Sequence, residues 1–223
     1  MTVRNHPIVT NEIYHIYNRS VAQQPIFRNI WENNRYLNLI DYYRFLNTPL
    51  RFSYYNRLRI DQRESILKSL YKENDIRIEI YSFSIMPNHY HILAKQVNEN
   101  GISDFIRYIQ DSYAKYLNKK TDRFGALFQS PFKAVRIEKE EQFIHVARYI
   151  HLNPLTSYLL KEPKELNTYI WNSWIDYVTG KPRAFVETGR LLSLVPKNKL
   201  EEFTFNQLDY QRKLENIKHL ILG

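Results

Sequence analysis

The chain has 223 residues, of which 43% are hydrophobic and 25% charged, as in an ordinary globular protein with one substantial core. It contains no cysteine, which excludes disulfides, thiolate metal sites and a cysteine nucleophile. No window approaches 18 uncharged apolar residues and the N-terminal sequence has no apolar signal core, so a cytoplasmic location is expected. The net charge of +9, together with 18 Tyr, 12 Phe and 3 Trp, favours a nucleic acid as partner.

The first half of the chain predicts strands and helices in alternation. Residues 12–18 alternate between faces as a strand does, whereas Tyr36, Leu39, Ile40 and Tyr43 recur at helical spacing. The predicted elements are a strand at 12–18, a helix at 30–46, a loop at 47–60, a helix at 61–72, and strands at 76–85 and 89–97 joined by a turn at Pro87-Asn88.

The second half predicts a long amphipathic helix, one more strand and further helices: a helix at 103–119, a turn at 122–125, a strand at 132–138, a helix at 140–151 that stops near Pro154, and a helix at 206–222. The order strand–helix–strand–strand–helix–strand predicts an α+β, ferredoxin-like split βαβ fold with a central antiparallel sheet and extra C-terminal helices. In this topology the first and third strands lie side by side.

Two histidines, His89 and His91, stand two residues apart in the strand predicted at 89–97. Side chains two apart on a strand share a face, so the pair forms a potential bidentate metal site. The alternative is a pair of ordinary polar strand residues. His15, on the neighbouring first strand, is interpreted as a structural hydrogen-bonding residue.

Four short segments then carry a resemblance to a known family. They are Tyr14-His15-Ile16-Tyr17-Asn18-Arg19, Met86-Pro87-Asn88-His89-Tyr90-His91, Gly125-Ala126-Leu127-Phe128-Gln129 and Tyr149-Ile150-His151-Leu152-Asn153-Pro154. In this order they resemble the REP-associated tyrosine transposases, a branch of the single-tyrosine HUH transposases in the IS200-like superfamily. The resemblance implies one HUH endonuclease domain over 1–178 with an insertion at about 47–72, and leaves 179–223 as a helical extension.

The resemblance also implies an activity. Members of this family are metal-dependent single-stranded DNA endonucleases and strand-transferases that form a 5′-phosphotyrosine, so the expected partner is single-stranded DNA with a REP-like hairpin. Imidazole, amide and phosphate oxygen ligands suit Mg²⁺ or Mn²⁺. The protein is expected to be a prokaryotic, nucleoid-associated monomer. The alternative is a domesticated hairpin-binding protein of the same fold without cleavage activity.

The nucleophile is predicted on the helix at 103–119. Tyr113 lies in the apolar stripe that faces the sheet, Tyr116 lies to its other side, and Tyr108 falls off the stripe. A plain core tyrosine would occupy the same position. The resemblance favours Tyr113, with Tyr116 as reserve.

The third metal ligand stays open between two amides. In related transposases a Gln stands four residues after the nucleophile, but that position here is Leu117, which cannot bind a metal. Asn118 is favoured as the nearest amide downstream, and Gln110 is the alternative on helical geometry.

DNA contacts are predicted on basic and amide side chains near the first strand and the 125–129 turn, namely Arg19, Arg123, Gln129, Lys133 and Arg136. The segment 51–59, which mixes Arg with Tyr and Phe, is either a further contact loop or a solvated insertion. His151 and Asn153 are interpreted as helix-end capping residues.

Overall fold

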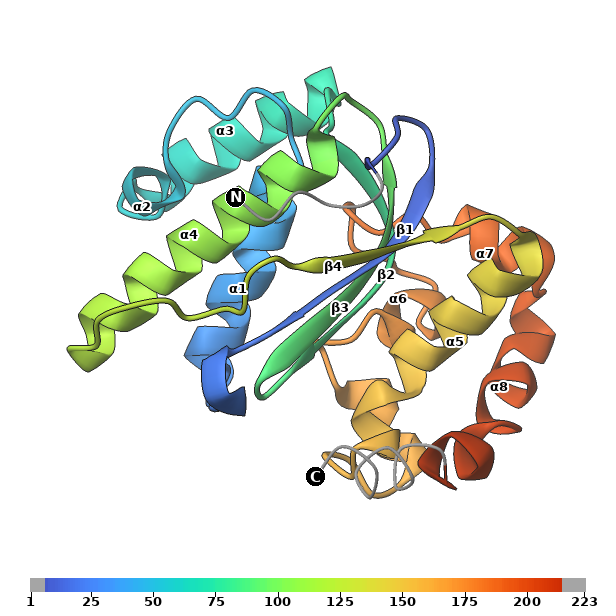
Figure 1. The fold of residues 1–223 in the computed structure, drawn as a ribbon. Helices are drawn as coiled ribbons and strands as arrows, with labels where there is room; N and C mark the ends of the chain where they lie inside the picture. Colours follow the sequence, from blue (N-terminus) through green and yellow to red (C-terminus); the bar gives the residue numbers. More distant parts are fainter. Residues whose placement is uncertain (1–6, 214–223) are drawn as a thin grey trace.

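The computed structural model describes residues 7–213. Its centre is a four-stranded antiparallel sheet in the order β2-β3-β1-β4 (Figure 1). The strands are β1 (Ile13–Arg19), β2 (Ile78–Met86), β3 (His89–Gln96) and β4 (Lys133–Ile137). The predicted ferredoxin-like arrangement is confirmed, with β1 and β3 adjacent at the centre.

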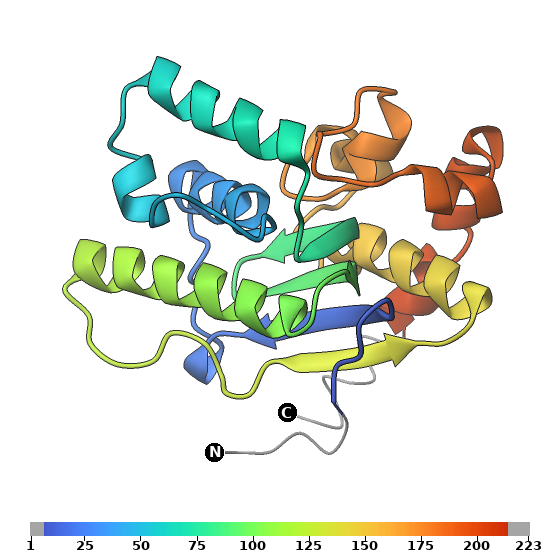
Figure 2. The same ribbon diagram turned by 90° about the horizontal axis from the view of Figure 1, so that it is seen from above.

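Helices cover both faces of the sheet (Figures 1 and 2). One side carries α1 (Ile30–Tyr43), α2 (Phe52–Tyr55), α3 (Ile60–Glu73) and α4 (Gly101–Thr121). The other carries α5 (Glu140–Thr156), α6 (Trp174–Val178), α7 (Gly189–Leu194) and α8 (Lys197–Phe205). Two short 3₁₀ turns, Val21–Gln23 and Pro163–Thr168, lie in the connections.

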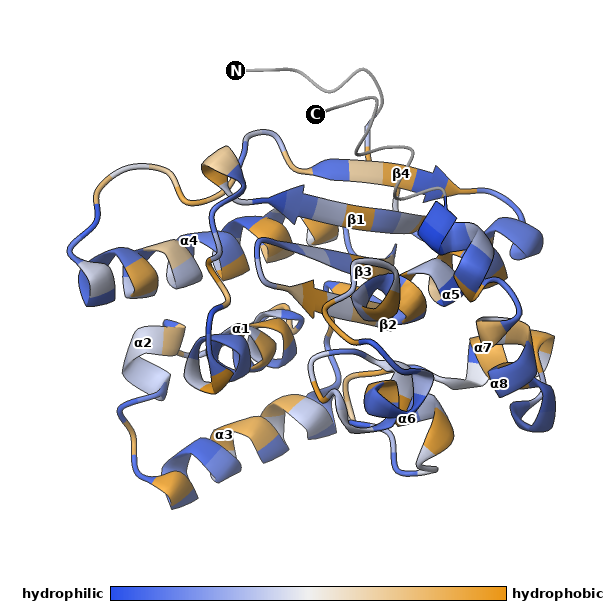
Figure 3. Ribbon diagram, turned by 90° about the horizontal axis from the view of Figure 1, so that it is seen from below, coloured by the Kyte–Doolittle hydropathy of each residue, from blue (hydrophilic) through white to orange (hydrophobic). Residues whose placement is uncertain are grey.

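The helices of the α1–α4 side are amphipathic. Hydrophobic and hydrophilic residues alternate along α3 and α4 (Figure 3), as expected for helices that pack one face against the rest of the protein and expose the other to solvent. A hydrogen bond of 2.5 Å from Tyr71 Oη to Asp41 Oδ1 ties α3 to α1. Within residues 7–213, no helix is both long and apolar enough to span a membrane.

The alternation of β1 and β3 divides their side chains between the two helical layers. Tyr90 points to the α1 and α4 side, where its ring lies 5.4 Å from that of Tyr36 and its hydroxyl accepts a hydrogen bond from Gln110. His89 and His91 therefore point to the α5 side. His91 pairs directly with Tyr17 in the ladder, so these two residues share that face.

Most boundaries fall within a few residues of the prediction, and α5 is the main exception. It continues to Thr156 with Pro154 inside it, although the sequence predicted a stop near that proline. Pro154 cannot donate a helical hydrogen bond to the carbonyl of Ile150. The buried Asn172 side chain donates to this carbonyl at 3.1 Å, and to that of His151 at 3.2 Å, which stabilises the helix end.

Two other predictions differ in detail. The predicted loop at 47–60 contains the short helix α2, and the helices α6, α7 and α8 were not predicted individually. Of the helix predicted at 206–222, residues 208–213 are helical and the remainder lies outside the described residues.

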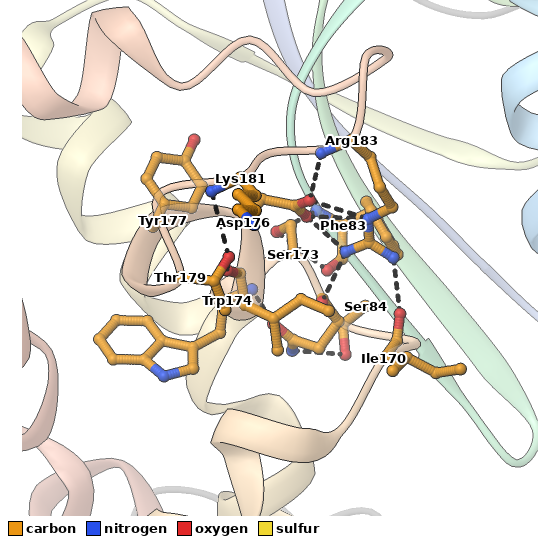
Figure 4. Close-up of polar contacts among 12 residues, drawn as sticks. Phe83, Ser84, Ile170, Ser173, Trp174, Asp176, Tyr177, Thr179, Lys181 and Arg183 are labelled. Atoms are coloured by element: carbon orange, nitrogen blue, oxygen red, sulfur yellow. Dashed lines mark hydrogen bonds and ion pairs between the residues drawn. The ribbon is translucent and has the colours of Figure 1, made fainter.

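A buried ion pair fastens the segment after α6 to strand β2 (Figure 4). The Arg183 guanidinium pairs with the buried Asp176 carboxylate, donates to the carbonyl of Ile170 at 2.6 Å, and lies 4.7 Å above the Phe83 ring. Three residues later, Val186 forms an isolated parallel bridge to Ile80 of β2. The segment thus covers part of the outer edge of β2.

Replacing Arg183 by Ala leaves the Asp176 carboxylate buried without its partner. We expect the free energy of unfolding to fall by about 3 kcal/mol, measured by urea denaturation. The matched control is Arg107→Ala, because the Arg107–Asp104 pair is exposed on both sides. That change is expected to cost less than about 1 kcal/mol. Equal losses for the two variants would contradict the anchoring role of Arg183.

Candidate functional site

Three histidines form a cluster on the α5 face of the sheet. His89 and His91 lie on β3 with ring centroids 5.1 Å apart and rings nearly perpendicular at 89°. His15 on β1 stacks beside His91 at 5.1 Å, and His15 Nε2 lies 2.9 Å from His91 Nδ1. The central position of both strands holds these side chains on a rigid support.

The hydrogen bonds around His89 assign its tautomer. Asn88 Nδ2 donates to the carbonyl of Gln23 at 3.1 Å, which identifies the other side-chain atom of Asn88 as the oxygen. This oxygen lies 2.7 Å from His89 Nδ1 and can only accept, so Nδ1 carries the proton. The lone pair of His89 is therefore on Nε2.

The lone pair of His89 points at an amide oxygen. Asn153 Oδ1, near the end of α5, lies 3.3 Å from His89 Nε2. In this orientation of the Asn153 amide two acceptors face each other, an arrangement that a cation bound by both would stabilise. Octahedral Mg²⁺ with bonds of about 2.1 Å holds adjacent ligands about 3 Å apart. The donor set and its spacing therefore fit a small divalent ion.

A tyrosine lies one helical turn before Asn153. The ring of Tyr149 is 5.4 Å from that of His91, nearly perpendicular at 87°, and 6.0 Å from that of His15. Residues four apart share a helix face, so α5 presents Tyr149 and Asn153 together to the histidines. Phe143, Ala147 and Ile150, buried along α5, fix its orientation against the rest of the protein.

Tyr113, the nucleophile favoured from the sequence, lies on the opposite face of the sheet. It is fully buried, and its hydroxyl donates to the carbonyl of Ile26 at 2.5 Å. Its ring packs on Phe27 and Tyr36 at centroid distances of 5.0 and 5.2 Å. Burial raises the pKa of Tyr113 well above that of a free phenol. The structure therefore separates Tyr113 from the histidines and gives it the environment of a core residue.

The other candidates on α4 share this separation. Tyr116 lies beside Arg35 of α1, whose guanidinium is 5.1 Å from its ring centroid. Gln110 donates to Tyr90 at 2.7 Å, on the α1 side of the sheet. Asn118 donates to the carbonyl of Gly125 at 2.9 Å and thereby holds the loop after α4. None of these three is brought to the histidine pair.

The predicted DNA contacts divide between the two faces of the sheet. Arg19 pairs with His89 and Lys133 pairs with Tyr17 in the ladders, so both lie on the histidine face. Arg136 pairs instead with Tyr14 and forms an ion pair with Glu12 at 2.7 Å. The last two contacts lie in the loop before β4, where Arg123 donates to the carbonyl of Ala126 and Gln129 to that of Ser20.

Burial holds His15 and His89 of the cluster, and His151 within α5, in the neutral form. Desolvation lowers the pKa of His15 to about 4, and desolvation with the nearby charge of Arg19 lowers that of His89 to about 4. His151 lies fully buried within α5, with Nε2 3.1 Å from the hydroxyl of Ser173, and burial lowers its pKa to about 3. Neutral imidazoles are the form that binds metal ions.

The sequence interpretation missed Tyr149 and Asn153 as site residues, although it singled out the segment that holds both. The available signal was their spacing of four, with Asn153 beside a proline. Treating Pro154 as a helix stop placed Asn153 at a frayed end, where capping was the natural interpretation. Only the continuation of α5 through Pro154 turns that spacing into one shared face.

Comparisons with known proteins agree with this fold. The family model described as IS200-like transposase matches residues 40–153, slightly more than half of the chain, and this range includes the histidine pair and ends at Asn153. A solved structure of a REP-associated tyrosine transposase bound to a REP hairpin matches with a TM-score of 0.56 and 11% identity, over 85% of this chain and 93% of that one. No curated protein matches the chain.

The low histidine pKa values predict a loss of stability in mild acid. Between pH 6.5 and 4 the unfolded chain binds protons at His15, His89 and His151, whereas the folded protein does not. Stability that is complete above pH 6.5 is therefore lost as the pH falls, by several kcal/mol in total, since one pKa unit corresponds to about 1.4 kcal/mol. Urea denaturation in the presence of EDTA checks this. His15→Gln should lose less stability across this window than the wild type, and an equal loss would contradict the assignment.

Proposed function

Because the chain belongs to the IS200-like transposase family, we propose that it is a metal-dependent endonuclease and strand-transferase for single-stranded DNA, with Tyr149 as nucleophile. The observation that carries this proposal is the shared face of α5, where Tyr149 and Asn153 meet His89 and His91. Tyr113 is replaced in this role because it lies across the sheet from the histidines and is fully buried.

The proposed reaction is a transesterification. The Tyr149 oxygen attacks a phosphorus of the DNA backbone, the bond from phosphorus to the 3′-oxygen breaks, and a 5′-phosphotyrosine forms. The phenol loses its proton, and a proton is added to the departing 3′-oxygen. Because one phosphoester replaces another, a second 3′-hydroxyl can reverse the step and join a different strand without ATP. Strand transfer requires this conservation of the phosphoester bond.

The residues proposed to hold a divalent ion, Mg²⁺ or Mn²⁺, are His89, His91 and Asn153. The 3.3 Å approach of Asn153 Oδ1 to His89 Nε2 supports this set, in which Asn153 replaces Asn118 and Gln110, the two amides considered from the sequence. When bound, such an ion polarises the phosphate and stabilises the charge that develops in the transition state. A set of three neutral donors leaves room for phosphate and water oxygens.

His15 is proposed to position His91 rather than to bind the ion. When His91 Nδ1 donates its proton to His15 Nε2 over 2.9 Å, the lone pair of His91 lies on Nε2, the nitrogen that faces away from His15. A second-sphere partner of this kind fixes both the tautomer and the ring orientation of a ligand. Burial keeps His15 neutral and so able to accept.

The substrate is proposed to be single-stranded DNA next to a hairpin. The net charge of +9, the placement of Arg19 and Lys133 on the histidine face, and the REP hairpin bound by the solved relative support this. We further propose that the protein acts as a monomer, with residues 1–178 forming the catalytic unit and 179–223 a helical extension.

The nucleophile is tested by covalent capture of DNA. Wild-type protein, Tyr149→Phe and Tyr113→Phe are incubated with labelled single-stranded hairpin DNA from the flanks of the gene and Mn²⁺, and adducts are resolved on denaturing gels. We expect Tyr149→Phe to reduce adduct formation by at least about 1,000-fold, because the substitution removes the proposed nucleophilic oxygen.

Tyr113→Phe is the matched control, because it removes one hydroxyl from another tyrosine of the same fold. It should form the adduct at near wild-type rate with a stability loss of about 1 kcal/mol, from the lost bond to Ile26. An adduct that survives Tyr149→Phe would refute the proposed nucleophile. Hairpin binding without any adduct would instead favour a binding protein that retains the fold but does not cut.

The metal ligands are tested by the affinity for Mn²⁺, followed by electron paramagnetic resonance of the free ion. Asn153→Ala should weaken binding roughly 10- to 100-fold, because it removes one of three protein donors. Asn118→Ala is the matched control, since its amide contacts Gly125 instead. Similar Mn²⁺ affinities of the two variants would argue against Asn153 as a ligand.

A further inference from the structure

A cavity of about 340 Å³ opens beside His89. Its walls come from three connections that meet at the end of the sheet: the turn after β1, the β2–β3 turn, and the chain after α5. The lining that matters here consists of Arg19, Gln23, His89, Tyr158 and Leu159. Because His89 belongs to both, the cavity adjoins the candidate centre at this residue.

The wall formed by the turn after β1 is rigidly held. Ala22 and Gln23 both adopt left-handed backbone angles, with φ of 54° and 53°. The Ser20 hydroxyl donates to the carbonyl of Gln24 at 2.6 Å, and Asn88 holds the carbonyl of Gln23 from the β2–β3 turn. Two non-glycine residues kept in this region indicate a wall whose shape is fixed by its surroundings.

The opposite wall continues from α5 and is fixed in the same way. Tyr158, two residues after the helix end, has a left-handed φ of 57° and is 55% exposed. The Ser157 hydroxyl donates to the carbonyl of Asn153 at 2.9 Å, and Leu160 N–H donates to that of Pro154 at 2.9 Å. The Arg212 guanidinium lies 5.2 Å from the Tyr158 ring centroid, which orients the ring. The wall is thus tied to the residue that faces His89.

We propose that this cavity binds a single unpaired nucleobase of the DNA, that of the nucleotide next to the phosphate attacked by Tyr149. The inference rests on the proposed function. Tyr158 offers an exposed aromatic ring on which a base can stack, and the exposed Leu159 side chain beside it adds an apolar surface. Arg19 supplies a cation for the adjoining phosphate, and the Gln23 amide can bond to a base edge.

The position of the cavity argues for a nucleotide rather than an unrelated small molecule. Ser157, the residue that caps α5, stands four positions after Asn153, which corresponds to roughly 6 Å along the helix axis. A strand whose phosphate lies between Tyr149 and His89 therefore brings a neighbouring base to Tyr158. The volume of the cavity is near the lower limit for ligand pockets, which is about 300 Å³. It therefore suits one base but not a stacked pair of bases.

The test uses the full chain with Tyr149→Phe, which blocks cutting, and a single-stranded oligonucleotide that the wild-type protein selects from a random pool. 2-Aminopurine replaces each nucleotide in turn, because its fluorescence is quenched when it stacks on an aromatic ring. We expect protein-dependent quenching at one position, loss of this quenching in Tyr158→Ala, and retention in Tyr158→Phe. Affinity should fall roughly 5- to 100-fold in Tyr158→Ala.

The matched control is Trp31→Ala, which removes an exposed aromatic side chain of α1, on the other face of the sheet, and should leave quenching and affinity unchanged. An abasic nucleotide at the quenched position should weaken binding by the protein that retains Tyr158 but not binding by Tyr158→Ala. Quenching that persists in Tyr158→Ala, or is equally lost in Trp31→Ala, would overturn the inference.

The result of the quenching experiment is independent of whether the protein cuts DNA. A wild-type adduct without any Tyr158-dependent position would leave the proposed function intact and refute the base pocket. Tyr158-dependent quenching without an adduct would support the pocket and contradict the cutting reaction.

Discussion

The alternation of side chains along β3 is the constraint on which the site depends. His89 and His91 can share a face only if Tyr90 between them occupies the other, and Tyr90 is fixed there by Tyr36 and Gln110. A nucleophile for the histidines must therefore lie on their face of the sheet, where α5 presents Tyr149. Tyr113, in the α4 layer, lies across the sheet from the histidines, although its helical stripe faces the sheet as the sequence predicted.

The position of α5 in turn depends on residues far from the site. Asn172 accepts from the backbone N–H of Trp174 and donates to the carbonyl that Pro154 leaves without a helical partner. This support keeps the last turn of α5 helical, so that Asn153 stays on the face of Tyr149. The Arg183–Asp176 pair holds the same segment against β2. The chain beyond α5 therefore has a structural role at the site although it supplies neither the phenol nor the imidazoles.

The sequence predicted the fold well because hydrophobic periodicity reports directly on strands and helices. The order of elements and the shared face of His89 and His91 followed from periods of 2 and 3.6 alone. The choice of layer for the nucleophile did not, because a stripe on the helix at 103–119 shows only that this helix faces the sheet. Which face of the sheet this helix covers depends on how the loops connect it to the strands. Likewise, a proline predicts the end of a helix unless another group donates to the carbonyl that the proline leaves without a partner. Here Asn172 donates to the carbonyl of Ile150, and local sequence patterns do not report a contact between residues 22 positions apart.

The neutrality of the cluster links its structure to its proposed chemistry. Burial lowers the pKa of His15 and His89 and so keeps them uncharged, and Asn153 carries no charge. Within residues 7–213, no group of three or more His, Cys, Asp or Glu forms an alternative metal site. A carboxylate in this position would repel the phosphate of a DNA strand. In the proposed reaction, neutral donors would leave the charge of a bound cation to be balanced by the phosphate of the substrate, so the ion would be held most tightly when that phosphate is present.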